Sequence, residues 1–216
     1  MKIDRYGRAK IFTQGEIQTL FSKGFTLNPP RDRALFAVML YTACRVNEAV
    51  TLLVVDVYDR RGQVRPEIGF RKNNTKGKLA TRTIPVIEEL RVRLKEYHPP
   101  SMEGYLFPGR YPNTHLRADS ASWILREACR RVGIEGVSTH SFRRTALTQM
   151  SNAGIPLRVI QEISGHRTLD ELYKYLEVRP DQVIGAVSSL SMLAPVEVVD
   201  FEVESEGVPV PETFPF

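Results

Sequence analysis

The sequence predicts an α+β fold that is mainly α-helical and carries one small antiparallel β-sheet. Apolar residues recur at three- and four-residue spacing through most of the chain, which is typical of amphipathic helices. Residues 64–70 and 81–86 have strand-like composition instead, and the polar stretch between them is typical of a hairpin. A length of 216 residues with 42% hydrophobic content is enough for one domain with a sizeable core.

The first predicted helices lie in the N-terminal fifth of the chain. Thr13 and Glu16 have the spacing of a capping box, and Gly24 is a suitable stop for the helix that they begin. After an Asn-Pro-Pro loop, residues 31–42 are apolar on most sides. We therefore expect a central buried helix there.

Arg45 directly follows the buried helix, and Glu48 opens another helix that runs to about Val54. A carboxylate one helical turn away can hold the Arg45 guanidinium in place. The alternative is an ordinary Arg–Glu helix pair, which contributes only about a few tenths of a kcal/mol.

The predicted sheet has up to three strands and a basic tip at residues 71–78. Such a tip is usually just solvated, but it can also carry a lysine into a DNA groove beside a phosphate. Further helices are predicted at residues 87–97, 120–132 and 181–190. In the second of these, the apolar stripe consists of Trp123, Ile124, Ala128 and Val132.

Three more helices are predicted shortly before the last one. Residues 140–152 form the first, and Pro156 begins the second, which ends near Gly165. A capping box that starts at Thr168 opens the third, which runs through Tyr175.

These helices bring several chemically active side chains together. His140 and Arg143 share a helix face, and His166 lies just past a helix end, where its side chain can turn into a cleft. Tyr173 and Tyr175 point roughly 200° apart on a helix. Tyr173 aligns with a leucine stripe and is expected in the core, which leaves Tyr175 to face the cleft.

A cluster of His, Arg and Tyr without an acidic residue at its centre suits an anion, in particular a phosphate attacked by a phenol. Any one of these residues taken alone is more often a packed or solvated side chain than a functional one. Their combined spacing favours a functional site.

The charge of the chain is unevenly distributed. The net charge is +5, yet residues 195–216 hold six acidic residues and no Lys or Arg, so residues 1–194 carry +11. That surplus favours a polyanionic partner such as nucleic acid, although a merely basic soluble protein is the alternative. Residues 1–10 are interpreted as a basic arm or an ordinary terminus. Residues 192–216 are interpreted as an acidic tail, which is either flexible or donated as a strand to a neighbouring subunit.

Both cysteines, Cys44 and Cys129, lie in apolar helical patterns, which favours a reducing cytoplasm over a disulfide framework. No Cys/His cluster has zinc-ligand spacing, so we expect no metal site. No stretch of the sequence has the length of a membrane span or the pattern of a signal peptide, so we expect no membrane association.

Together with Arg45, the cluster resembles the tyrosine recombinase, or phage integrase-like, family. The matching pieces are Thr42-Ala-Cys-Arg45-Val-Asn-Glu48, His140-Ser-Phe-Arg143, Gly165-His166, and Tyr175 nine residues later. The resemblance implies a catalytic domain at residues 11–191 without the usual N-terminal core-binding domain. The chain is therefore similar to minimal recombinases such as the bacterial fimbrial switch invertases, or to a catalytic fragment or mobile-element remnant.

The chain departs from the family pattern at three places. Ala43 stands where the family often has Gly, which we expect to matter little, and Ser164 stands where an apolar residue usually precedes Gly-His. The hairpin, which ends in residues 81–85, is one residue longer than usual. Three lysines therefore remain candidates for the catalytic lysine, in the order Lys76, Lys78 and Lys72.

The resemblance implies phosphoryl transfer on DNA without metal or nucleotide cofactor. Tyr175 would attack a backbone phosphate and form a 3′-phosphotyrosyl link. Arg45 and Arg143 would clamp the non-bridging oxygens, and Lys76 would protonate the leaving 5′-oxygen.

The remaining predicted site residues support this chemistry. His140 would act as the acid–base partner of the tyrosine, His166 would donate a hydrogen bond to the phosphate, and Glu48 would hold neighbouring side chains. The predicted DNA contacts are Lys72, Lys78, Arg82 and Arg144.

The predicted function is site-specific recombination of double-stranded DNA, with integration, excision and inversion left open. The family implies a homotetramer on two DNA sites, and a monomer or weak oligomer when free. The alternatives are a type IB topoisomerase-like activity and a catalytically silent DNA-binding regulator on the same fold. A metal-dependent nuclease is disfavoured because the sequence lacks a cluster of acidic residues.

Overall fold

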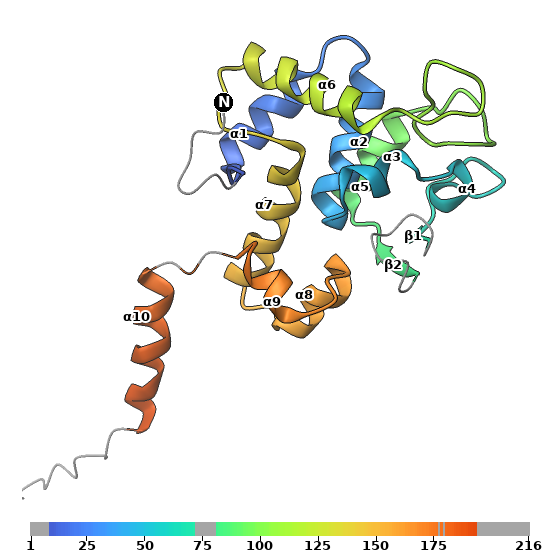
Figure 1. Cartoon of the computed structure of the whole chain (residues 1–216). Coiled ribbons are helices and arrows are strands. Elements are labelled where there is room, and N and C mark those ends of the chain that lie inside the picture. The colour runs from blue at the N-terminus through green and yellow to red at the C-terminus, as the bar shows by residue number, and fades with distance from the viewer. Residues whose placement is uncertain (1–8, 72–80, 177, 179, 194–216) are drawn as a thin grey trace, which may run out of the picture. The chain divides into compact units, whose positions relative to one another are not determined.

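The computed structural model describes residues 9–71, 81–176, 178 and 180–193 (Figure 1). The chain divides into two compact units, residues 1–177 and residues 178–216. The first unit contains the two-stranded sheet and all helices up to α9. The pocket described below belongs to this unit alone.

The first unit is organised around α2 (Pro29–Thr42), which packs against α5 (Glu88–Glu96) and α7 (Thr139–Asn152). Eight of the 14 residues of α2 are buried, so the helix is covered on most sides, as its sequence predicts. The helix begins two residues earlier than expected because proline is tolerated in a first helical turn, where the N–H groups have no intrahelical partner.

Further helices pack around α2 and complete the first unit. The predicted capping box starts α1 (Gln14–Thr19), and a π-helical turn (Leu20–Gly24) carries the chain on to the predicted stop. This turn packs against α6 (Ala118–Arg131). Trp123 of α6 is 47% exposed, so its predicted place in the apolar stripe is wrong. The buried face consists of Ala121, Ile124, Leu125, Ala128 and Cys129. Trp123 points away from it, because it lies two residues, roughly 200° around a helix, from both Ala121 and Leu125.

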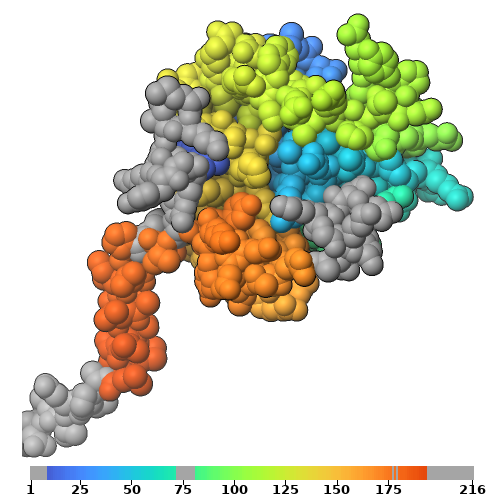
Figure 2. Space-filling view, viewed as in Figure 1, coloured from blue at the N-terminus to red at the C-terminus, as the bar shows by residue number. Residues whose placement is uncertain are grey.

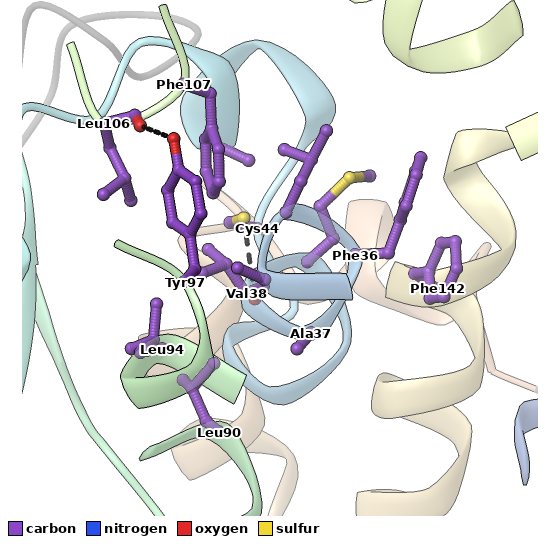
Figure 3. Packing of buried hydrophobic residues seen from close by; sticks show 14 of the residues in the cluster. Phe36, Ala37, Val38, Cys44, Leu90, Leu94, Tyr97, Leu106, Phe107 and Phe142 are labelled. Carbon is purple, nitrogen blue, oxygen red and sulfur yellow. Dashed lines mark hydrogen bonds between the residues drawn. The ribbon is translucent and has the colours of Figure 1, made fainter. Parts of the chain in front are cut away.

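The core joins segments that are far apart in the sequence (Figure 3). Phe36 of α2 stacks on Phe142 of α7, with ring centroids 5.2 Å apart. Tyr97 stacks on Phe107 at 5.6 Å, and its hydroxyl donates a hydrogen bond to the carbonyl of Leu106 at 2.8 Å. These contacts fix α2, α5 and α7 as a rigid base for the segments that carry the pocket.

The sheet consists of β1 (Glu67–Phe70) and β2 (Arg82–Pro85), which pair antiparallel with Phe70 opposite Arg82. Among the described residues the sheet has two strands, and the expected third is reduced to one isolated bridge between Tyr58 and Val64. The hairpin tip lies outside the described residues, and with it the three candidate lysines, Lys72, Lys76 and Lys78.

Two short helices replace the single helix expected after Arg45. They are α3 (Val46–Val50) and α4 (Val54–Val57). Leu53 has extended backbone geometry, and its N–H donates to the Asp56 carboxylate at 3.0 Å, which caps the start of α4. This local capping bond ends one helix and starts the next.

The C-terminal part of the first unit contains α8 (Leu157–Ser164) and α9 (Leu169–Tyr173). Helix α9 ends two residues before Tyr175, earlier than predicted. Tyr173 is 51% exposed, so its predicted place in the core is wrong. Leu172 is the buried residue of this short helix. A helix of about one and a half turns makes too little contact to bury Tyr173 as well.

The second unit begins with α10 (Pro180–Ser188), which continues into a 3₁₀ turn (Ser189–Leu193). None of its described side chains is buried, and its apolar residues are exposed. Within the described part of the chain, no helix combines the length and the apolar character that a membrane span requires.

Candidate active site

A pocket of about 630 Å³ opens where three parts of the first unit meet. Figure 2 shows the blue surface of the N-terminal segments beside the yellow and orange surface of residues 139–176. The pocket is lined by five of the residues predicted from the sequence, which are Arg45, His140, Arg143, His166 and Tyr175. These residues come from sequence positions up to 130 apart, and the fold brings them to one place.

Two left-handed turns deliver the segments that line the pocket. Ala43 ends α2 with φ +51°, after which Arg45 takes the N-cap position of α3. Gly165 ends α8 with φ +65° and is followed directly by His166. The side-chain amide of Gln161 donates to the His166 carbonyl at 3.1 Å and so holds the second turn in place.

Arg143 is the most buried cation of the site, at 1% exposed. Its Nη1 donates to the carbonyl of Ala43, and its Nη2 donates to the carbonyl of Ser164 at 2.9 Å and lies 2.9 Å from Nε2 of His166. Its Nε is buried and has no hydrogen-bond partner among the described residues. An arginine that is charged, buried and incompletely paired is suited to an anion in the pocket.

Burial lowers the pKa of Arg143 to about 10, and the nearby positive charge of Arg45 acts in the same direction. The guanidinium therefore stays charged at neutral pH. Glu48 partly offsets this lowering through its negative charge.

Glu48 is 1% exposed and connects two arginines. It accepts hydrogen bonds from the backbone N–H of Arg45 at 2.8 Å and from Arg45 Nη1 at 3.2 Å. The guanidinium of Arg82 binds it with both terminal nitrogens, at 3.2 and 2.8 Å. Burial acts to raise the pKa of Glu48, but the hydrogen bonds and charge of Arg82 outweigh it, and the net pKa is lowered.

Arg82 and Arg144 do not line the pocket, although both were predicted to contact DNA. Arg82 is held on Glu48, and its guanidinium also lies 4.6 Å from the centroid of the Phe70 ring. Arg144 is buried and donates to the carbonyl of Ala9. Both side chains therefore hold parts of the fold together, and their contacts with DNA stay predictions.

His166 and Tyr175 lie against each other, with ring centroids 4.9 Å apart. The guanidinium carbon of Arg143 lies 5.6 Å from the centroid of the Tyr175 ring. The backbone carbonyl of Tyr175 accepts a hydrogen bond from Thr148 at 3.2 Å, which ties this segment to α7. Burial lowers the pKa of His166 to about 3, helped by the charges of Arg143 and Arg45, so the imidazole is neutral at neutral pH.

The pocket also contains residues that were not predicted as site residues. Arg167 and Lys174 line it. Each is adjacent in the sequence to a predicted site residue, and this adjacency could have identified them. Ser164 places its Oγ 2.8 Å from Nδ1 of His166. The polar side chain of Ser164, two positions before a predicted site histidine, could have indicated this contact.

The described residues contain no group of three or more His, Cys, Asp or Glu side chains arranged to hold a metal ion. Cys44 also lines the pocket, but burial raises the pKa of its thiol to about 12. This thiol is therefore protonated and a poor nucleophile at neutral pH.

The fold and the pocket together define a mainly helical domain with a cationic pocket beside a tyrosine, suited to phosphate chemistry. The sequence matches the phage integrase family over residues 10–182. The chain belongs to this family.

Known members of the family are similar over most of this chain. The tyrosine recombinase XerA of Pyrococcus furiosus is 30% identical over 167 residues, which cover 76% of this chain and 56% of XerA. The tyrosine recombinase XerC of Herpetosiphon aurantiacus is 28% identical over 193 residues, covering 85% of this chain and 60% of XerC. The chain thus spans about three-fifths of the length of these curated relatives.

Solved structures have the same fold. A crystal structure of XerA recombinase superimposes with a TM-score of 0.66 at 21% identity, covering 83% of this chain and 64% of that chain. XerH site-specific recombinase, bound to its palindromic difH substrate in a post-cleavage complex, gives a TM-score of 0.63 at 20% identity, covering 82% of this chain and 52% of that chain. The predicted fold class and family are confirmed.

Proposed function

We propose that this chain is the catalytic part of a site-specific DNA recombinase, which cleaves and rejoins DNA strands through a 3′-phosphotyrosyl intermediate. The observation that carries the proposal is the convergence of Arg45, His140, Arg143, His166 and Tyr175 on one pocket. Such a set supplies cations for a phosphate, groups that exchange protons, and a nucleophile. Membership of the phage integrase family supports the same reaction.

In the proposed reaction the phenolic oxygen of Tyr175 forms a bond to phosphorus while the bond from phosphorus to the 5′-oxygen breaks. The phenol loses a proton, and the 5′-oxygen gains one. A phenol has an ordinary pKa of about 10, so it needs a proton acceptor and a strong electrostatic field. Arg45 and Arg143 would supply that field at the non-bridging oxygens, and each such donor typically contributes about 10²–10³ in rate.

The proton transfers need two further groups. His140, which lines the pocket from the first turn of α7, would act as the acid–base partner of Tyr175. Lys76 would protonate the leaving 5′-oxygen, with Lys78 and Lys72 as the next candidates on the same hairpin. Glu48 would hold Arg45 in its clamping position through the contacts described above.

The proposed substrate is double-stranded DNA, and the proposed assembly is a homotetramer on two DNA sites that is monomeric or weakly associated when free. XerH is a relative in fold whose structure was solved on its DNA substrate. The exposed apolar side chains of α10 supply a surface suited to contact with another subunit. A DNA-processing role also supports the proposed location in the cytoplasm.

The test compares Tyr175→Phe with the matched control Tyr173→Phe on a nicked duplex taken from the DNA that flanks the gene. Wild type and Tyr173→Phe should form a covalent protein–DNA adduct on a denaturing gel. Tyr175→Phe should form none, because it lacks the attacking oxygen, and should still shift the DNA on a native gel. An adduct from Tyr175→Phe would exclude this tyrosine as the nucleophile.

Two alternatives are separated by related measurements. A type IB topoisomerase-like enzyme would relax a supercoiled plasmid that lacks any recombination site. A catalytically silent DNA-binding regulator would bind the flanking DNA without forming an adduct. The proposed recombinase should form the adduct and join strands from two sites.

A further inference from the structure

Three hydrogen bonds in series join four groups behind the pocket. Nη2 of Arg143 lies 2.9 Å from Nε2 of His166, Nδ1 of His166 lies 2.8 Å from Oγ of Ser164, and this Oγ lies 3.2 Å from the Gln161 carbonyl. A guanidinium has only donors, and a carbonyl only accepts. Nε2 must therefore be the acceptor, which places the imidazole proton on Nδ1, where it is donated to Ser164.

This tautomer conflicts with the role proposed for His166 in recombination. A hydrogen bond to a phosphate oxygen requires a proton on the nitrogen that faces the pocket. In the DNA-free protein that nitrogen presents a lone pair to Arg143. A neutral imidazole carries one N–H, so for the ring to remain neutral the proton on Nδ1 leaves when another binds at Nε2.

Ser164 is suited to both arrangements because a hydroxyl can accept a hydrogen bond or donate one. If it turns to donate to Nδ1, it gives up the Gln161 carbonyl. That carbonyl keeps the N–H of Gly165 at 2.8 Å, so no buried acceptor is left without a partner. The hydrogen released at Nη2 of Arg143 becomes available to the phosphate.

We propose that Ser164 is a positioning residue that supports His166 in two tautomers, with Nδ1 protonated in the free protein and Nε2 protonated when a DNA phosphate occupies the pocket. The exchange passes one proton to water and takes one from water, so the charge of the ring is unchanged. Ser164 is 0% exposed and acts through His166 without touching DNA. The second half of this proposal rests on the proposed function.

The first measurement is the ¹⁵N NMR spectrum of the histidine rings in the DNA-free full chain. His166, assigned by its loss in His166→Gln, should have its proton on Nδ1. In Ser164→Ala the proton should stay on Nδ1, because Arg143 still donates to Nε2, but this N–H loses its acceptor and should exchange with water faster than in wild type. Ser164→Thr, which keeps the hydroxyl, should behave as wild type. Ser141→Ala is the matched control, because it removes another fully buried hydroxyl, one that accepts from Ser138. A proton on Nε2 in free wild type would overturn the proposal.

The second measurement is the rate of adduct formation on the nicked duplex described above. Ser164→Ala should be slower by about tenfold, while Ser164→Thr and Ser141→Ala should stay within about threefold of wild type. Equal rates for Ser164→Ala and wild type would overturn the switch. If wild type forms no adduct, the proposed function and the switch both fail, and the NMR result still decides the tautomer of the free protein.

Discussion

Arg143 is a charged side chain held almost wholly out of water. Removing a guanidinium from water costs several kcal/mol unless its donors are paired. Two backbone carbonyls and one imidazole nitrogen pair most of them, while Nε has no partner among the described residues. The site therefore holds its main cation in place before an anion arrives, which is the condition for electrostatic catalysis.

The backbone conformation of Ala43 also costs free energy. Its φ of +51° is in the left-handed region, which costs an L-residue roughly 1–2 kcal/mol, whereas glycine adopts it freely. The buried methyl group recovers about 0.8 kcal/mol, which glycine would lose. The two effects oppose each other, in keeping with the expectation that Ala in place of Gly matters little here.

The lowered pKa of His166 predicts a loss of stability in mild acid. Its pKa falls from 6.5 to about 3 on folding, so between these values the unfolded chain binds a proton that the folded protein does not. Stability must then decrease as the pH falls below 6.5. Allowing for water in the open pocket, the loss at pH 5 is about 1–2 kcal/mol relative to pH 7.

Urea unfolding of wild type and His166→Gln at pH 7 and pH 5 measures this effect. The lowered pKa of Glu48 also makes acid destabilising, but it acts in both proteins alike. Wild type should lose about 1–2 kcal/mol more than His166→Gln. Equal losses would show that His166 titrates normally in the folded protein.

At the scale of elements, helix α7 carries His140 and Arg143, and the other active groups follow helix ends. The turns at Ala43 and Gly165 present Arg45 and His166, and the chain leaving α9 presents Tyr175. Strand β2 is tied to α3 by the ion pair between Arg82 and Glu48. The hairpin base is thereby linked to the segment that carries Arg45.

This link predicts different effects for the two arginines that bind Glu48. Arg82→Met should destabilise the protein by about 3 kcal/mol, because it leaves a buried carboxylate with one partner. Arg45→Met should cost about 1 kcal/mol, since the Arg45 side chain is more exposed, but should reduce adduct formation by at least 10². Urea unfolding and the adduct assay measure the two quantities.

A double-mutant cycle provides the control for Arg82. Arg82→Met combined with Glu48→Gln should be less destabilising than the sum of the single changes, because the buried charge of Glu48 is removed together with that of Arg82. Additive losses would mean that the ion pair contributes nothing, and Arg82 would then be free to serve as a DNA contact.

At the scale of the whole molecule, the two units differ in how they are stabilised. Every buried residue of the two hydrophobic clusters comes from positions between Phe12 and Leu172. The described part of the second unit contributes no buried side chain, and Val183, Ile184 and Val187 of α10 are all exposed. The first unit therefore has a complete core of its own.

Deleting residues 178–216 should leave the thermal midpoint of the first unit within about 2 °C of the full chain, because no core contact is removed. The deletion should weaken assembly on DNA, measured by analytical ultracentrifugation with the flanking duplex. The full-length variant Val183→Glu with Val187→Glu should weaken assembly in the same way. A midpoint lowered by more than about 5 °C would show that the core depends on the second unit.

The predictions from the sequence succeeded where the signal was local. Capping boxes and apolar spacing located α1, α2, α6 and α7 to within about two residues at their starts. Tyr173 was assigned to a buried face wrongly, because helical spacing gives the direction of a side chain and not the presence of a neighbour that covers it. Trp123 was assigned wrongly because its position on the helix is opposite to the buried residues Ala121 and Leu125. The short helices around Leu53 were missed because their boundary depends on one side-chain cap.

The sequence by itself determined the fold class and five of the residues that line the pocket, since their types and spacing express local backbone geometry and the chemistry that a phosphate requires. Only the tertiary structure decided how those residues are held. Arg82 meets Glu48 across 34 positions, and Ser164 and Arg143 fix the two edges of the His166 ring. Such contacts leave no periodic pattern in the chain, because they form only where packing excludes water and polar groups must find one another.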